Sequence, residues 1–106
     1  MGLMDLFRRT PRGPTTADLL AQGALVVDVR SKSEFKSGHV KGAKNVPLNQ
    51  LGSFMRQRKP ADGPVVTCCA SGMRSGKAAA KFAERGYTVV NGGPWTRVQR
   101  EMAKVR

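Results

Sequence analysis

The sequence predicts an α/β domain, built on a central, mostly parallel sheet of four to five strands with helices on both faces. Three short runs are almost wholly apolar and rich in β-branched residues, as is typical of strands covered on both sides; they are residues 24–28, 65–68 and 87–90. Stretches of helical character separate these runs. Strands that alternate with helices at these lengths favour a parallel sheet. The 106 residues give room for one domain with a modest core.

The first half of the chain should contain two helices with defined starts. Thr15-Thr16-Ala17-Asp18 and Ser31-Lys32-Ser33-Glu34 both have the form of a capping box, in which two side chains satisfy the first free amides of a helix. A short strand is expected over residues 43–46. Apolar residues then recur at spacings of three and four, which predicts a helix over residues 48–57. Residues 59–64 are interpreted as a loop.

The second half should continue the alternation of strands and helices. The central strand leads through a tight loop into a helix over residues 75–85, which Gly86 should end. The next strand is expected over residues 87–90 and a turn over residues 91–94. A final helix is indicated by an apolar stripe at helical spacing, formed by Trp95, Val98, Met102 and Val105.

The N-terminal end reads differently from the rest of the chain. Residues 1–14 contain paired arginines together with proline and glycine. We therefore predict a basic extension over residues 1–14, with one short helix around residues 4–7, and a folded domain over residues 15–106. The basic residues follow the short apolar start, which is the wrong order for a secretory signal, so we expect a cytoplasmic protein.

The charge balance narrows the classes of partner. The chain has nineteen basic residues and only seven acidic ones, which gives a net charge of +12. Such a surface can steer anionic substrates, bind an acidic protein, or simply be solvated. Nucleic-acid binding is not favoured, because the charges are scattered and no aromatic residues are interleaved with them. No apolar run approaches the ~20 residues that a membrane span requires.

The two cysteines, Cys68 and Cys69, are adjacent. Neighbouring cysteines cannot form the long-range disulfides of a secreted mini-domain, and with a single histidine they make a poor zinc site. We expect no metal and no cofactor. A reducing compartment and a reactive thiol fit this pattern better. Because side chains alternate along a strand, Cys68 should face away from Cys69.

The passage from the central strand into the following helix is the predicted site of chemistry. A strand that runs through a tight loop into a helix brings free backbone N–H groups and the positive helix end to one point. A thiol at that point loses its proton more easily, and an anionic substrate is attracted to the same place. The sequence therefore predicts nucleophilic sulfur chemistry.

Residues 69–75, Cys-Ala-Ser-Gly-Met-Arg-Ser, resemble the active-site loop of the rhodanese family, whose usual form is Cys-x-x-Gly-x-Arg-Ser. Further motifs of that family follow in the same order upstream: Asp28-Val29-Arg30, Glu34-Phe35, Gly38-His39-Val40, Gly42-Ala43 and Asn45-Val46-Pro47. The resemblance covers roughly residues 15–104. It implies a rhodanese-like fold and a thiosulfate sulfurtransferase activity.

The resemblance also implies roles for the loop. Cys69 would be the nucleophile, taking sulfur from a donor such as thiosulfate as a persulfide and passing it to cyanide or a thiol. The substrate-binding cradle would comprise Ala70, Ser71, Gly72, Met73, Arg74 and Ser75. Arg74 would either point at the anionic donor or brace the loop. Ser75 would cap the helix, and Met73 would shape the choice of acceptor.

Four polar residues near the predicted strand ends have other expected roles. Asp28 and Glu34 are interpreted as structural, whereas the role of Arg30 stays open. An ion pair between Arg30 and Glu34 is one expectation. His39, which lies between turn glycines, should brace the turn.

Two other classes of function stay open. Counted from Cys68, the pattern Cys-x5-Arg ends at Arg74, which is the spacing of cysteine-dependent phosphatases similar to rhodaneses in fold. The histidine usual before the phosphatase cysteine is replaced by Thr67. The other alternative is a binding module without turnover.

Overall fold

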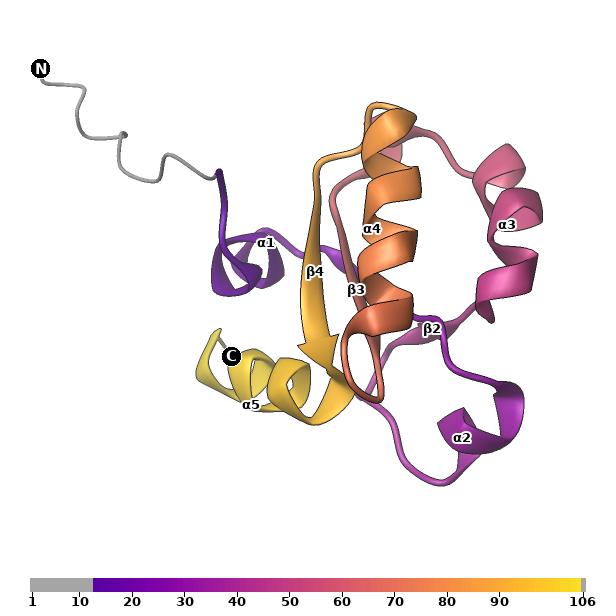
Figure 1. Ribbon diagram of the computed structural model, residues 1–106. Helices are drawn as coiled ribbons and strands as arrows, with labels where there is room; N and C mark the ends of the chain where they lie inside the picture. The colour runs from indigo at the N-terminus through magenta and orange to yellow at the C-terminus, as the bar shows by residue number, and fades with distance from the viewer. Residues whose placement is uncertain (1–12, 106) are drawn as a thin grey trace, which may run out of the picture.

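The computed structural model describes residues 13–105, and a sheet of four parallel strands forms its centre (Figure 1). The strand order is β2-β1-β3-β4. The strands are β1 (Leu25–Asp28), β2 (Lys44–Asn45), β3 (Val65–Cys69) and β4 (Val89–Pro94). All three pairings are parallel, so every strand ends at the same edge of the sheet. The predicted α/β class is confirmed.

Helices cover both faces of this sheet, as predicted. In Figure 1, α1 and α5 lie on one side of the strands, and α3 and α4 lie on the other. The helix bounds are α1 (Thr16–Ala21), α2 (Lys32–Lys36), α3 (Leu51–Gln57), α4 (Met73–Glu84) and α5 (Trp95–Val105). The short α2 follows the carboxyl end of β1, so it lies at the edge where the strands end.

The strand β3 separates two apolar clusters, because its side chains alternate between the faces. Val66 and Cys68 join the cluster under α1 and α5, together with Leu19, Leu20, Val26, Val40 and Val98. Val65 and Cys69 join the cluster under α3 and α4, whose largest fully buried side chain is Phe82. The two neighbouring cysteines thus face opposite layers of the core, as expected.

Both predicted capping boxes are present. The backbone N–H of Asp18 donates to the Thr15 hydroxyl at 3.1 Å, and the Asp18 carboxylate accepts from the N–H of Thr15 at 2.9 Å. Ser31 and Glu34 exchange the same two bonds at the start of α2. Each cap satisfies amides that a helix start leaves free, at roughly 1 kcal/mol per cap.

Several predicted bounds are wrong in the middle of the chain. The expected strand over residues 43–46 has only two paired residues. The helix expected over residues 48–57 begins as a 3-10 turn, Leu48–Gln50, before α3. The loop over residues 59–64 contains another 3-10 turn, Pro60–Asp62, which has proline in its first turn where the missing N–H is not needed.

The turn predicted over residues 91–94 is wrong, because β4 continues to Pro94, with an irregularity in its pairing to β3 between Thr67 and Cys69. Gly92 is required here for close approach, since a Cβ at this position would lie 2.9 Å from the backbone oxygen of Thr67. Gly92 therefore allows β4 to pack closely on β3, and α5 begins directly after Pro94. Glycine pairs signal turns and close packing alike, and the sequence alone favoured the wrong one.

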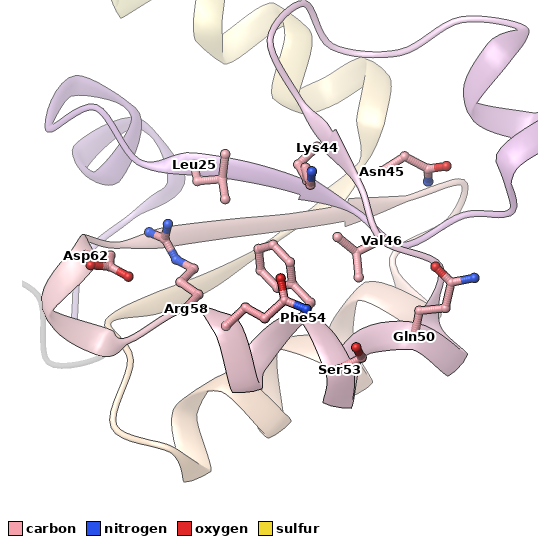
Figure 2. A pocket seen from close by; sticks show the side chains of 10 residues that line it. Leu25, Lys44, Asn45, Val46, Gln50, Ser53, Phe54, Arg58 and Asp62 are labelled. Atoms are coloured by element: carbon pink, nitrogen blue, oxygen red, sulfur yellow. The ribbon is translucent and has the colours of Figure 1, made fainter.

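A pocket of about 640 Å³ lies beside the edge strand β2, against α3 (Figure 2). Its walls include Lys44, Phe54, Arg58 and Asp62. None of residues 69–75 lines it, so this hollow is separate from the predicted site of sulfur chemistry.

The last two expectations to compare with the structure concern the N-terminal extension and membrane-spanning helices. The predicted extension lies almost wholly outside the described residues, and the helix expected around residues 4–7 lies outside them altogether. The bounds of the folded domain therefore stay a prediction. Within residues 13–105, none of the helices has the length and apolar character to cross a membrane.

Candidate active site

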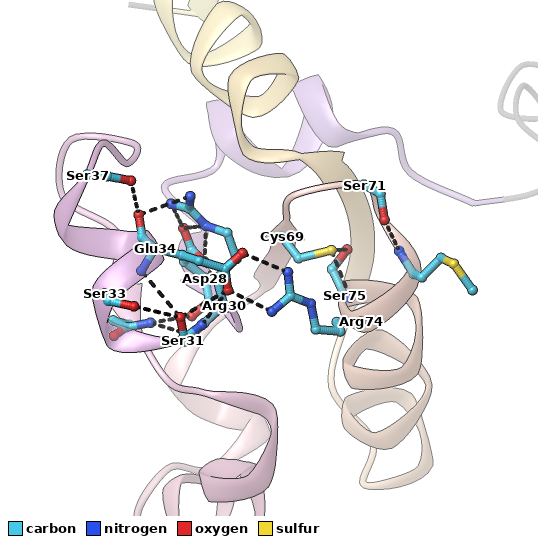
Figure 3. A network of polar contacts seen from close by, with 12 residues as sticks. Asp28, Arg30, Ser31, Ser33, Glu34, Ser37, Cys69, Ser71, Arg74 and Ser75 are labelled. Atoms are coloured by element: carbon cyan, nitrogen blue, oxygen red, sulfur yellow. Dashed lines mark hydrogen bonds and ion pairs between the residues drawn. The ribbon is translucent and has the colours of Figure 1, made fainter.

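Cys69 is the last residue of β3, and its sulfur lies under the loop that leads into α4. The Sγ atom accepts a hydrogen bond from the backbone N–H of Gly72 at 3.0 Å and a longer one from the N–H of Ser75 at 3.4 Å. The Ser75 hydroxyl lies 3.4 Å from the same sulfur (Figure 3). The thiol donates to that hydroxyl, while the two backbone amides of the cradle, defined as residues 70–75, donate to the sulfur.

These donors change the acidity of the thiol. Burial by itself raises the pKa of Cys69, because a charge is less well solvated inside the protein. The Ser75 hydroxyl and the amides of Ser75, Gly72 and Ser71 outweigh that cost, and the pKa of Cys69 lies below its ordinary value. A thiolate is therefore stabilised here without a neighbouring base.

The Cys69 residue has no exposed area. Ala70 and Ser71, which follow it, are exposed, as is Met73 at 74%. A substrate therefore reaches the sulfur only when side chains or backbone of the cradle move aside.

Cys68 has the opposite environment. It is fully buried on the other face of the sheet, and burial first, then the nearby charge of Asp28, raises its pKa to about 12. This thiol stays protonated over the physiological range and contacts no cradle amide. In the described part of the chain, no group of three His, Cys, Asp or Glu side chains is arranged to hold a metal ion.

Ser75 does not cap α4, which corrects the prediction from sequence. The helix begins two residues earlier, at Met73, because Gly72 has a φ of +104° and turns the chain into the helix. Ser75 is instead buried within the first turn. Its hydroxyl donates to Asn91 Oδ1 at 2.7 Å, and its carbonyl accepts a bond from the Thr67 hydroxyl at 2.9 Å.

Asn91 is the site residue that sequence reasoning missed. Its side-chain oxygen accepts bonds from the Ser75 hydroxyl and from the N–H of Gly93, at 2.7 and 3.0 Å. Its side-chain nitrogen donates to the carbonyl of Gly72 at 3.1 Å. Asn91 therefore ties β4 to the two residues whose amides contact Cys69. Asn91 was missed because residues 91–94 were interpreted as a turn, whereas Asn91 belongs to β4.

Arg74 leaves the cradle and reaches across to α2 (Figure 3). Its two terminal nitrogens donate to the two carboxylate oxygens of Glu34 at 2.8 and 3.1 Å. The bond from Arg74 first, and the backbone bond from Ser31 second, lower the pKa of Glu34 to about 2. The guanidinium is thus paired with Glu34, a contact that fits the second of the two roles expected for Arg74, bracing of the loop.

Arg30 pairs with Asp28, so the expected ion pair between Arg30 and Glu34 is wrong. The Arg30 guanidinium donates hydrogen bonds to both carboxylate oxygens of Asp28 at 2.8–3.1 Å, and both residues are buried. It also donates to the backbone carbonyls of Glu34 and Gly38 and lies 5.0 Å from the ring centre of Trp95. Removing one partner of such a buried pair typically costs about 3–5 kcal/mol.

His39 has the bracing contacts expected of it. Its Nδ1 lies 2.7 Å from the carbonyl oxygen of Phe35, and the two rings stack at 3.7 Å between centres. Both contacts fold the segment after α2 onto that helix.

A comparison with protein families matches residues 15–94 to the rhodanese-like domain. The chain belongs to the rhodanese-like domain family. The match spans β1 to β4 and therefore includes the whole cradle.

Curated relatives of this rhodanese-like domain include a named enzyme. The chain is 36% identical over 87 residues to the thiosulfate sulfurtransferase GlpE of Pseudomonas fluorescens (strain SBW25), covering 82% of this chain and 78% of that protein. It is 41% identical over 70 residues to the uncharacterized protein YqhL of Bacillus subtilis (strain 168), covering 63% of this chain. That match spans only 52% of YqhL, about half its length.

Solved structures show the same fold. A rhodanese-related protein from Thermoplasma volcanium is 25% identical with a TM-score of 0.67, covering 81% of this chain and 87% of that one. A rhodanese from E. coli, solved with anions, is 28% identical with a TM-score of 0.59, covering 70% and 89%. The Bacillus anthracis CoADR-RHD structure matches at 31% identity and a TM-score of 0.66, covering 83% of this chain but only 16% of the other.

Proposed function

We propose that this rhodanese-like domain is a sulfurtransferase that carries sulfane sulfur as a persulfide on Cys69. The donor is an anionic sulfur compound such as thiosulfate, and the acceptor is cyanide or a thiol. The observation that carries the proposal is the pair of amide hydrogen bonds to Cys69 Sγ, from Gly72 and Ser75, together with the lowered pKa of that thiol. The identity to GlpE, named a thiosulfate sulfurtransferase, supports the same reaction class.

The proposed cycle has two displacements. In the first, the Cys69 thiolate attacks the outer sulfur of thiosulfate; the new Sγ–S bond forms, the bond to the sulfonate sulfur breaks, and sulfite leaves with the electron pair. In the second, the acceptor attacks the terminal sulfur, and the thiolate of Cys69 is released. The amides of Gly72 and Ser75 stabilise the negative charge at the start and the end of the cycle. No general base is required.

The two alternatives have weaker support. A phosphatase would need Cys68 as its nucleophile, yet that thiol is buried on the opposite face with a pKa raised to about 12. A binding module without turnover would have no need of a stabilised thiolate. Because both cysteines are free thiols, we further propose a reducing compartment, the cytoplasm, as the place of action.

Intact-mass measurement after mixing with thiosulfate tests the proposal, with Cys69→Ser and Cys68→Ser as a matched pair. The wild type and Cys68→Ser should each gain one sulfur, mapped by peptide analysis to Cys69, and should transfer it to cyanide. Cys69→Ser should gain none. A gain that survives in Cys69→Ser but not in Cys68→Ser would overturn the assignment, and turnover of an aryl phosphate would favour the phosphatase reading.

A further inference from the structure

Three arginines stand where the strands end, and two of them are already committed. Arg30 is held by Asp28 and by two backbone carbonyls, and Arg74 is held by both oxygens of Glu34. Arg97, in the first turn of α5, is exposed. Within residues 13–105 its side chain makes no hydrogen bond and no ion pair. Arg97 is thus the uncommitted guanidinium of this group.

Contacts through two glycines place Arg97 beside the cradle. A Cβ on Gly93 would lie 3.5 Å from Arg97 Nη1, and a Cβ on Gly72 would lie 3.3 Å from the Cα of Gly93. The N–H of Gly72 is the group that donates to Cys69 Sγ at 3.0 Å. Because neither glycine has a side chain, only backbone lies along this line of contacts from the guanidinium to the cradle.

Strand pairing supports the same placement. Pro94 is the register partner of Cys69 in the sheet, and Arg97 follows it by three residues. The two carboxylates at this edge of the sheet, Asp28 and Glu34, are each neutralised by an arginine. An anion that approaches Cys69 past Arg97 therefore meets a guanidinium that is not already paired, whereas Asp28 and Glu34 are each paired with an arginine.

We propose that Arg97 binds the anionic end of the sulfur donor and so selects sulfonate-type donors over neutral ones. The inference rests on the proposed function. While the outer sulfur of thiosulfate is attacked by Cys69, its sulfonate must point away from the sulfur and out of the cradle. A planar guanidinium can donate two parallel hydrogen bonds to the oxygens of that group. Arg97 acts as a specificity-determining residue and leaves the stabilisation of the thiolate to the amides.

The test compares two reagents that alkylate Cys69, the anionic iodoacetate and the neutral iodoacetamide. Both need the cradle to open, so the ratio of their rates reports anion recognition alone. Arg97→Gln should lower the iodoacetate rate about tenfold, as expected for loss of a charge-assisted hydrogen bond, while the iodoacetamide rate changes less than about twofold. Arg97→Lys should keep part of the ratio. Arg100→Gln removes the same charge one turn along α5 and should leave the ratio unchanged.

Two results with Arg97→Gln would overturn the proposal: an unchanged rate ratio, or an equal fall of both rates, which would mean that Arg97 acts on the loop. The same fall in the ratio for Arg100→Gln would also overturn it, because general surface charge would then be the cause. Alkylation does not depend on sulfur transfer. A wild type that fails to take sulfur from thiosulfate would contradict the proposed function, while the rate ratio would still decide whether Arg97 recognises anions. If transfer occurs, Arg97→Gln should raise the KM for thiosulfate.

Discussion

Cys68 and Cys69 are neighbours in the chain, but β3 presents their side chains to opposite faces of the sheet. One thiol lies among apolar side chains near Asp28, and its pKa rises to about 12. The other accepts hydrogen bonds from backbone amides and has a further bond with the Ser75 hydroxyl, and its pKa falls. Local solvation and hydrogen bonding, rather than the type of residue, decide which sulfur can act as a nucleophile.

The lowered pKa of Cys69 predicts how its reactivity depends on pH. In a Cys68→Ser background, the rate of alkylation by iodoacetamide should show an inflection below the ~8.5 of a free cysteine, because the thiolate persists to lower pH. Added salt should move the inflection little, since the amides act at short range. The unfolded protein in urea is the control and should titrate near ~8.5. An inflection at or above that value in the folded protein would remove the electrostatic role of the cradle.

The contacts of Asn91 lead to a second prediction about the pKa of Cys69. Asn91→Ala removes the acceptor of the Ser75 hydroxyl and the donor to the Gly72 carbonyl, so both sulfur contacts lose their support. We expect the inflection for Cys69 to move upward, with a loss of roughly 1 kcal/mol of stability per hydrogen bond. Gln99→Ala, at an exposed position on α5, is the control. A loss of stability without any shift of the inflection would make Asn91 a purely structural residue.

The position of Cys69 at the start of the loop could be predicted from sequence, whereas the contacts that hold this loop in place could not. Cys69 stands in a motif of contiguous residues, so spacing alone identifies the loop. The contact between Ser75 and Asn91 joins residues sixteen positions apart and depends on how closely β4 packs beside α4. A contact between residues so far apart in the chain produces no recognisable spacing pattern in a single sequence.

At the scale of elements, the cradle is held from two sides. Asn91 connects it to β4, and the pair of Arg74 and Glu34 connects α4 to α2. The start of α4 was predicted two residues late, because Ser75 looked like a cap while Gly72 turns the backbone. Capping boxes were predicted correctly at α1 and α2 because both partners lie within four residues.

The ion pair between α2 and α4 predicts a common phenotype for its two partners. Arg74→Lys loses the forked geometry, so it should weaken thiosulfate use nearly as much as Arg74→Ala does, and Glu34→Gln should have the same effect. All three should lower the melting temperature. A near-normal Arg74→Lys beside a weak Arg74→Ala would instead indicate direct contact with the donor. Lys77→Ala on α4 is the control for loss of charge.

The pKa of Glu34 sets the pH range in which this pair acts. The folded value of about 2 lies below the ordinary 4.5, so the pair stabilises the fold fully above pH 4.5. The contribution is lost as pH falls from 4.5 toward 2. The difference in melting temperature between wild type and Glu34→Gln should therefore be constant above about pH 5 and shrink below it.

At the scale of the whole molecule, alternation of strands and helices predicted the fold class, since each buried run was visible on its own. The strand order and the two-residue β2 were not visible, because they depend on pairing between distant segments. The short β2 has too few residues for a pattern of its own to emerge.

Buried Cys68 predicts how global stability depends on pH. In the folded state this thiol stays protonated until about pH 12, whereas in the unfolded chain it ionises near ~8.5. Stability should therefore fall as pH rises above that value, by up to about 1.4 kcal/mol per pH unit. Urea unfolding at pH 7 and pH 10 should show the advantage of wild type over Cys68→Ala shrinking by about 2 kcal/mol. An equal advantage at both values would contradict the raised pKa.

The arrangement of the two thiols also bears on what happens after a sulfur has been loaded. The backbone of β3 separates Cys68 from Cys69, so Cys68 cannot serve as a resolving thiol that forms an internal disulfide and expels the sulfur as sulfide. Under the proposed chemistry, the Cys69 persulfide would persist until a separate acceptor molecule binds and attacks its terminal sulfur. The lifetime of the persulfide would then shorten as the concentration of the acceptor rises. Without an acceptor, the domain would keep the sulfur bound to Cys69.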